Sequence, residues 1–139
     1  MTMSKILIKA NELREIVASQ IGPCTGTVFS LYVADEDYYC PSVGDAEDVI
    51  ADAKVDQDEY MAEAHDCDDF ARLLVAAFIK DAYREGLRRP AYCFGLIFTH
   101  GHAFNWFVDD TKTIQLVEPQ TGSVFGLWNL DEAVVFMLV

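Results

Sequence analysis

The sequence predicts one α+β domain in which a central helix packs on an antiparallel sheet. The chain has 139 residues, 52% of them hydrophobic, which is enough for one buried core and too few for two. Apolar side chains recur at helical spacing after Asp66, and short apolar runs separated by turn residues follow from Ala91 onwards. We therefore expect a helical, acidic half at 1–65 and a helix with an antiparallel meander at 66–139.

The first half combines short elements with turn signals. Asn11 suits the N-cap of a helix that Gly22 and Pro23 end, and residues 25–33 alternate as a strand does. Residues 55–65 are acidic and indicate no regular element. The predicted elements of this half are a strand at 5–8, a helix at 11–21, a strand at 25–33, a loop at 35–44 and a short helix at 45–54.

The strongest helical signal lies at 66–86. Asp66 suits its N-cap, Gly86 suits its C-terminal cap, and Pro90 prevents the helix from resuming. The residues of its apolar stripe follow a helical repeat and are Phe70, Leu73, Leu74, Ala77 and Phe78.

The last third of the chain reads as a series of strands joined by tight turns. The predicted strands are 91–99, 102–108, 113–118 and 123–128, and 134–139 is either a final strand or a short helix. Consecutive strands with short turns form an antiparallel meander.

Acidic residues are concentrated in one quarter of the chain. The formal charge is −13, and residues 35–69 hold fourteen acidic residues and one base, Lys54. This excess of acidic residues argues against a protein that binds nucleic-acid phosphates. No apolar run is long enough to span a membrane. Without a signal peptide, a cytoplasmic location is expected. A solvated loop, a cation site, a basic partner and a DNA-like surface are all compatible with the acidic segment.

The four cysteines form no C-x-x-C pair. They are Cys24, Cys40, Cys67 and Cys93. Since no secretory signal accompanies them, a disulfide framework is not expected. His100 and His102 lack further ligands at zinc-binding spacing, so a zinc site is not expected either.

Cys67, His102 and Glu118 occur in an order that suits nucleophilic thiol chemistry. Cys67 lies in the first turn of the central helix, where free N–H groups favour a thiolate, although the flanking aspartates oppose it. His102 begins one strand and Glu118 ends the next, so the imidazole would take the thiol proton and the carboxylate would orient the imidazole. Taken singly, each residue also has an ordinary structural explanation.

Three motifs extend this constellation. They are D-C-D-D-F-A from Asp66, G-H-A-F-N from Gly101 and E-P-Q-T from Glu118. Together they resemble the C-terminal cysteine-protease domain of the fairy-ring mushroom agglutinin and related bacterial and phage proteins. The first also resembles bacterial transglutaminase-like cysteine peptidases. The resemblance implies a papain-like or transglutaminase-like fold with a triad of Cys67, His102 and Glu118.

The resemblance also implies a Ca²⁺ (or Mn²⁺) site. Its ligands would be Asp68, Asp69, Glu118 and Gln120, whose oxygen atoms suit a hard cation. A bound cation would offset the carboxylates that otherwise oppose a thiolate.

Two amide side chains are candidates for support of the site. The papain family places an oxyanion-hole glutamine about six residues before the cysteine, where this chain has Met61, and Gln57 is the nearest upstream amide. Asn105 is expected to hold structure near the site by donating from its side-chain amide.

These observations together predict a cysteine peptidase or amidase that is calcium-activated and acts on peptide or protein substrates, of which the acidic surface favours basic ones. The alternative is a non-enzymatic, acidic phage- or prophage-type binding module for a basic host factor. Neither a nucleic-acid nor a membrane partner is expected.

Overall fold

The helices of this protein pack on a six-stranded sheet. The structure is a computed structural model and describes residues 6–25, 29–84, 90–130 and 132–139. The helices are α1 (Ala10–Gln20), α2 (Gly22–Thr25), α3 (Val43–Ala53) and α4 (Cys67–Arg84), with 3-10 turns η1 (Val55–Gln57) and η2 (Leu127–Asn129). The strands are β1 (Ile6–Lys9), β2 (Ser30–Tyr32), β3 (Asp37–Cys40), β4 (Phe94–Thr99), β5 (Ala103–Val108), β6 (Ile114–Glu118), β7 (Ser123–Gly126) and β8 (Val134–Leu138).

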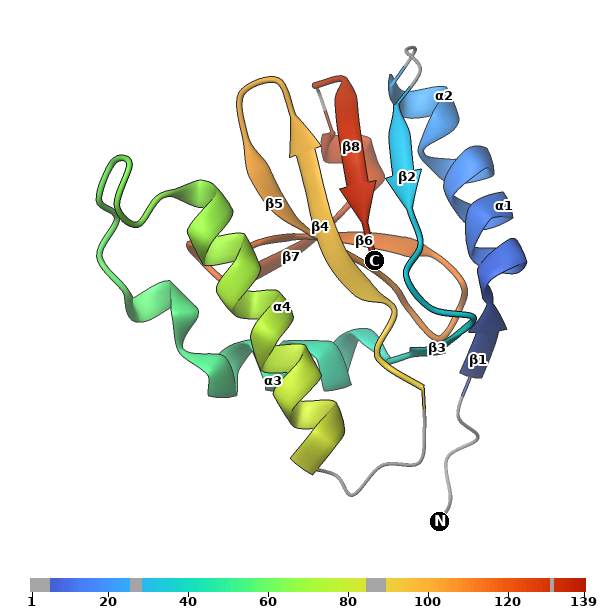
Figure 1. The fold of residues 1–139 in the computed structure, drawn as a ribbon, viewed down its shortest axis with the longest axis horizontal. Helices are drawn as coiled ribbons and strands as arrows, with labels where there is room; N and C mark the ends of the chain where they lie inside the picture. The colour runs from blue at the N-terminus through green and yellow to red at the C-terminus, as the bar shows by residue number, and fades with distance from the viewer. Residues whose placement is uncertain (1–5, 26–28, 85–89, 131) are drawn as a thin grey trace.

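The sheet has the order β2-β8-β4-β5-β6-β7 (Figure 1). Strands β4 to β7 form the antiparallel meander that the sequence predicts. Strand β8 returns to pair with β4, and β2 pairs with β8 in parallel. The α+β class is therefore confirmed, whereas the pairing of β2 and β8 joins segments too distant in sequence for local patterns to reveal.

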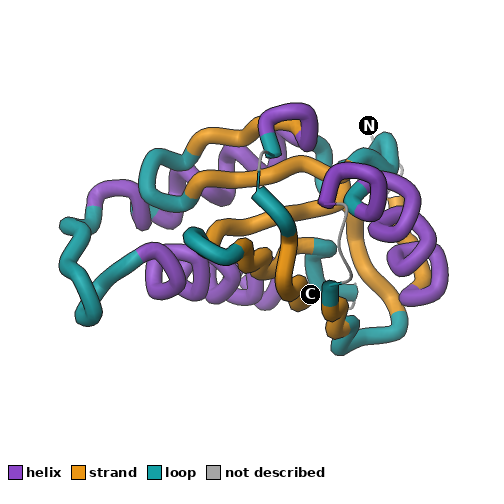
Figure 2. The backbone as a smooth tube through the Cα atoms, turned by 90° about the horizontal axis from the view of Figure 1, so that it is seen from above, coloured by secondary structure: helices purple, strands orange, loops and turns teal. Residues whose placement is uncertain are grey.

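The sheet is buried on both faces, and helices lie on both sides of the strands (Figure 2). Alternate residues of one strand enter different cores: Phe94 packs with α3 and α4, and Ile97 packs with α1, β1 and β3. This alternation follows from the two-residue period of a strand. It explains why β4 and β5 read as near-continuous apolar runs.

Helix α4 starts and packs as its sequence predicts. Phe70, Leu74 and Phe78 are buried, while Leu73 lies at the exposed edge of the predicted stripe. The predicted C-terminal cap, Gly86, lies outside the described residues. No helix in the described ranges has the length and hydropathy needed to cross a membrane.

The N-terminal half departs from the prediction at three places. Residues 37–40, expected in a loop, form β3 and pair with β1, because Tyr38 and Cys40 alternate into the core. Helix α1 begins at Ala10 without a side-chain cap, so Asn11 is not its N-cap. The strand expected at 25–33 spans only Ser30–Tyr32 among the described residues. Helix α3 agrees with the prediction, with Ser42 accepting from the Asp45 N–H at 3.0 Å.

Asn105 ties helix α4 to the sheet. It is fully buried on β5, and its side-chain Nδ2 donates to the carbonyls of Ala71 on α4 at 2.9 Å and of Gly95 on β4 at 3.1 Å. Its Oδ1 has no hydrogen-bond partner within the described residues. Buried donors are costly to leave unpaired, so these two bonds fix the position of the first turns of α4.

We expect Asn105→Ala to lower the free energy of unfolding by about 1–3 kcal/mol, because two buried hydrogen bonds are lost. Urea denaturation measures this change. Asn11→Ala is the matched control, since Asn11 is exposed on α1, and it should change stability by less than about 0.5 kcal/mol. Equal stability of the Asn105 and Asn11 variants would contradict the anchoring role.

Candidate functional site

Cys67 is the first residue of α4 and is half-buried. The preceding loop is folded back by an isolated bridge between Met61 and His65. The His65 Nε2 lies 3.0 Å from the Asp58 Oδ2, and its ring packs on Phe70 of α4 with centroids 4.6 Å apart. These contacts fix the direction from which the chain enters the helix at Cys67.

His102 and Glu118 form a hydrogen-bonded pair. His102 lies just before β5 and Glu118 ends β6, and the His102 Nε2 donates to the Glu118 Oε2 at 2.6 Å. The bond to Glu118 raises the pKa of His102; burial opposes this, and the charges of Glu118 and Glu132 reinforce it. The pairing orients the imidazole and favours its protonated form.

No hydrogen bond joins the Cys67 sulfur to His102 among the described residues. The imidazole Nε2 is occupied by Glu118, which leaves Nδ1 as the remaining ring nitrogen. The structure thus brings two of the three predicted catalytic residues into contact. The catalytic roles of all three stay a prediction.

The aspartates around Cys67 form a compact acidic cluster. Asp66, Asp68 and Asp69 each offer an oxygen within 4.8 Å of the others, and the Asp66 N–H donates to the Asp69 Oδ2 at 3.2 Å. A hydrogen bond with Asp68, together with burial and the negative charge of both neighbours, raises the pKa of Asp66 to about 6. Arg72 lies one turn further on, 3.4 Å from the Asp68 Oδ2.

The four predicted cation ligands do not form one carboxylate cluster. Asp68 and Asp69 lie with Asp66, and Glu118 is not part of that group. The Gln120 backbone N–H donates to the Glu118 Oε1 at 3.2 Å, so this pair belongs to the turn after β6.

The two predicted supporting amides differ in position. Gln57 is exposed in η1, and its backbone N–H donates to the Lys54 carbonyl at 3.1 Å. Asn105 is buried and gives its amide to two backbone carbonyls, so it supports α4 and has no donor left for an oxyanion. The sequence alone does not show that Gln57 is exposed and Asn105 buried, because the burial of a side-chain amide depends on tertiary packing.

A small pocket of about 110 Å³, lined by both polar and apolar side chains, adjoins His102. Its polar lining includes Glu132, whose Oε2 accepts from the Thr99 hydroxyl. Sequence reasoning missed this pocket because its walls come from the β4–β5 turn and the segment between β7 and β8. The lining residues are Thr99, His102, Phe104, Phe125, Asn129, Leu130 and Glu132.

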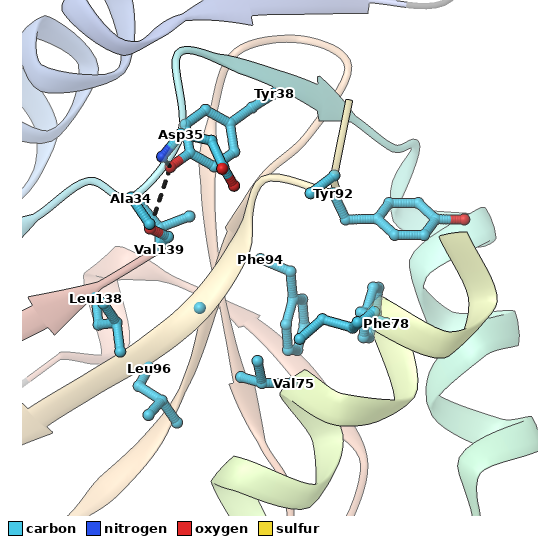
Figure 3. A pocket seen from close by; sticks show the side chains of 13 residues that line it. Ala34, Asp35, Tyr38, Val75, Phe78, Tyr92, Phe94, Leu96, Leu138 and Val139 are labelled. Atoms are coloured by element: carbon cyan, nitrogen blue, oxygen red, sulfur yellow. Dashed lines mark hydrogen bonds between the residues drawn. The ribbon is translucent and has the colours of Figure 1, made fainter. Parts of the chain in front are cut away.

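A larger, mostly apolar pocket of about 240 Å³ lies between α4 and β4 (Figure 3). Phe78 and Phe94 stack in it with ring centroids 3.7 Å apart, and the Tyr38 hydroxyl donates to the Val139 carbonyl at 3.1 Å at one end. It contains none of the residues that the sequence predicts for the site.

Comparisons with known proteins give one family and a set of solved structures. The model of the family described as "Agglutinin C-terminal" matches residues 38–124. The structure described as "PSL1a-E64 complex" has a TM-score of 0.86 and 24% identity. A Polyporus squamosus lectin, described as bound to the human-type influenza-binding epitope Neu5Aca2-6Galb1-4GlcNAc, has a TM-score of 0.83 and 23% identity. No curated protein matches the chain.

This chain spans about half of each of these two structures. The matches cover 99% of this chain, but 52% and 51% of the respective chains to which it is similar. At these identities the two likenesses show the fold.

These comparisons correct the predicted function. The agglutinin part of the resemblance is confirmed, but the papain-like protease part is not supported. The match to the agglutinin C-terminal family model contradicts the predicted cysteine peptidase or amidase, and with it the predicted peptide or protein substrates. The alternative of a phage-type module for a basic host factor is wrong for the same reason.

Replacing Glu118 with Gln should lower the pKa of His102 toward its ordinary value of 6.5, because the hydrogen bond to a charged acceptor is lost. NMR titration of the imidazole measures this pKa. Glu132→Gln, which removes only a more remote charge, should lower it less. A pKa that is unchanged in the Glu118 variant would contradict the pairing.

Stability should depend on the protonation of Asp66. Its folded-state pKa of about 6 lies above the ordinary 3.8, so the unfolded chain loses this proton first as the pH rises. The stabilising contribution is complete below about pH 4 and is lost as the pH rises through about 6. The urea midpoint of the wild type should fall relative to that of Asp66→Asn as the pH rises from about 4 to about 6. Above this range the two midpoints should depend on pH with the same slope.

The control for this series is Asp45→Asn, which changes an exposed aspartate in the first turn of α3. Its pH profile should follow that of the wild type. An Asp66→Asn profile that also follows the wild type would contradict the raised pKa.

Proposed function

Because the chain belongs to the agglutinin C-terminal family, we propose that it binds carbohydrate, in the pocket beside His102. The family match over residues 38–124 is the observation that carries the proposal. The glycan complex of the neighbouring Polyporus squamosus lectin supports the same class of ligand.

The pocket beside His102 has the chemistry that a sugar requires. Its polar groups are a hydroxyl (Thr99), an imidazole (His102), an amide (Asn129) and a carboxylate (Glu132), which together offer both donors and acceptors to sugar hydroxyls. Phe104, Phe125 and Leu130 supply apolar contact. Its volume of about 110 Å³ is below the roughly 300 Å³ of sites that enclose drug-sized ligands, so it would hold only part of an oligosaccharide.

Trp128 would extend this binding surface. It precedes Asn129 and is 86% exposed. The indole ring of Trp128 packs closely against Gly126. A Cβ atom at position 126 would lie 2.9 Å from the indole Cδ1 and Nε1, so only glycine fits there without a shift of the ring. An exposed, rigid aromatic ring with one N–H donor suits contact with the apolar face of a sugar.

Charge favours a neutral sugar at this site. The chain carries −13 overall, and the pocket contains Glu132 with Glu118 behind His102. A negative surface disfavours an anionic ligand such as a sialylated sugar. We therefore infer a preference for neutral glycans.

The finer fold assignment and the site roles are separate proposals. Packing of α4 on β4 and β5 supports a papain-like or transglutaminase-like arrangement. The position of Cys67 at the start of α4 and the His102–Glu118 pair support a reactive thiol assisted by an imidazole and a carboxylate. The cytoplasmic location is also kept as a proposal.

A cation fits the acidic cluster at the start of α4. Three carboxylates within 4.8 Å of one another offer only oxygen donors, which suit Ca²⁺. The hydrogen bond with Asp68 is the largest cause of the raised pKa of Asp66, and the negative charges of Asp68 and Asp69, which a cation would offset, add to it. Asp66 therefore replaces Glu118 in the ligand set we propose, with Asp68 and Asp69.

Titration calorimetry with N-acetyllactosamine tests carbohydrate binding. We expect a Kd between about 0.1 and 1 mM, and weaker binding of the sialylated trisaccharide. Trp128→Ala should weaken binding about tenfold, a loss of about 1.4 kcal/mol. Tyr83→Ala is the matched control because Tyr83 is also 86% exposed and lies on α4. Absence of binding to neutral glycans, or equal losses in both variants, would overturn the proposal.

Millimolar Ca²⁺ should raise the Tm by a few degrees, since a ligand that binds only the folded chain stabilises it by mass action. The double variant Asp68→Asn/Asp69→Asn should lose this shift. Asp48→Asn, on the exposed face of α3, should keep it. A thermal shift that persists in the double variant would show that the cation binds at another site. The absence of a shift in the wild type would contradict the cation site altogether.

A further inference from the structure

Cys40 and Cys93 come together although 52 residues separate them in the sequence. Cys40 ends β3, and Cys93 directly precedes β4. Their neighbours Tyr39 and Tyr92 form an isolated parallel bridge. The Tyr39 N–H donates to the Ala91 carbonyl at 2.8 Å, and the Cys93 N–H donates to the Tyr39 carbonyl at 2.7 Å.

This register places the two thiols side by side. In a parallel pairing the residues that follow a bridged pair are again opposite each other, so Cys40 faces Cys93. Adjacent strands lie about 4.8 Å apart, which is within the 4.4–6.8 Å between Cα atoms that a disulfide spans. The bridge therefore brings the two backbones to disulfide distance.

The packing gives a second, independent indication that these side chains share one face. Cys40 and Cys93 belong to the core on the α1 side of the sheet. Tyr39 and Tyr92 pack into the core on the α4 side, with ring centroids 5.4 Å apart. Both thiols are buried, with exposures of 1% and 0%.

The electrostatics agree with a direct contact. Burial raises the pKa of the Cys93 thiol, and hydrogen bonding with the Cys40 thiol raises it further. The Cys93 thiol is therefore protonated, and both thiols are inaccessible in the folded chain. Reaction therefore requires opening of the fold, or occurs while the chain is folding.

We propose that Cys40 and Cys93 form a disulfide site that closes when the chain folds in the presence of a small disulfide oxidant such as oxidised glutathione. One thiolate attacks the oxidant, forms a mixed disulfide and releases one glutathione. The second thiolate displaces the other glutathione and completes the protein disulfide. Two protein thiols are oxidised, and one oxidised glutathione is reduced to two thiols, with no other reactant.

The cross-link would join the β1–β3 ribbon to the six-stranded sheet. The loop that it closes contains α3, η1 and α4. Closing a loop of this length restricts the unfolded chain and so favours the folded one. Cys24 is exposed at α2 and Cys67 is half-buried at α4, and neither shares the register of this pair.

Refolding of the full chain from reduced, urea-unfolded protein in a glutathione redox buffer tests this site. Mass spectrometry of the trapped product should show the loss of two hydrogen atoms and one dominant linked peptide pair, Cys40–Cys93. The oxidised protein should keep the circular dichroism of the reduced protein and should unfold at a higher urea concentration.

Two variants serve as controls. Cys24→Ser/Cys67→Ser should form the same disulfide in the same yield, and Cys93→Ala should form no intramolecular disulfide. Four free thiols after refolding would overturn the proposal, as would glutathione adducts without cross-linking or a mixture of pairings in which Cys40–Cys93 does not dominate.

Discussion

The buried amide of Asn105 is the interaction on which the arrangement of this molecule depends. It bonds the carbonyl of Ala71 in α4 and that of Gly95 in β4 from a position on β5. Because the amide is fully buried, the two bonds have no competition from water. They hold the start of α4, and with it Cys67 and the acidic cluster, in a fixed position against the strands that carry His102.

The polar end of the sheet follows from this frame. Strands β5 and β6 are antiparallel, so His102, which directly precedes β5, and Glu118, which ends β6, lie at the same end of these strands. The segment before β8 adds Glu132 to the pocket beside His102. This end of the strands therefore concentrates groups that donate and accept hydrogen bonds, and the exposed Trp128 precedes Asn129 of the same pocket.

The sequence predicts the elements better than it predicts their partners. Helix α4 follows a clear helical stripe, and β4 to β7 follow apolar runs between turns, so local patterns suffice. The sequence does not reveal strand β3, which has only four residues. Two of them, Asp37 and Tyr39, are not fully buried. The pairing of β8 with β4 and of Cys40 with Cys93 depends on long-range register, which no local pattern contains.

The motifs identify the agglutinin family, but the reaction inferred from them is contradicted. One fold supports more than one function, so a family resemblance does not determine the reaction.

The central claim is that carbohydrate binds beside His102. Backbone and indole NMR spectra recorded during titration with N-acetyllactosamine test it directly, because each signal reports its own residue. The account predicts shifts of Thr99, His102, Asn129 and the Trp128 indole N–H, which surround one pocket. Unchanged spectra, or shifts confined to Val75, Phe78 and Leu96 around the apolar pocket by α4, would contradict it.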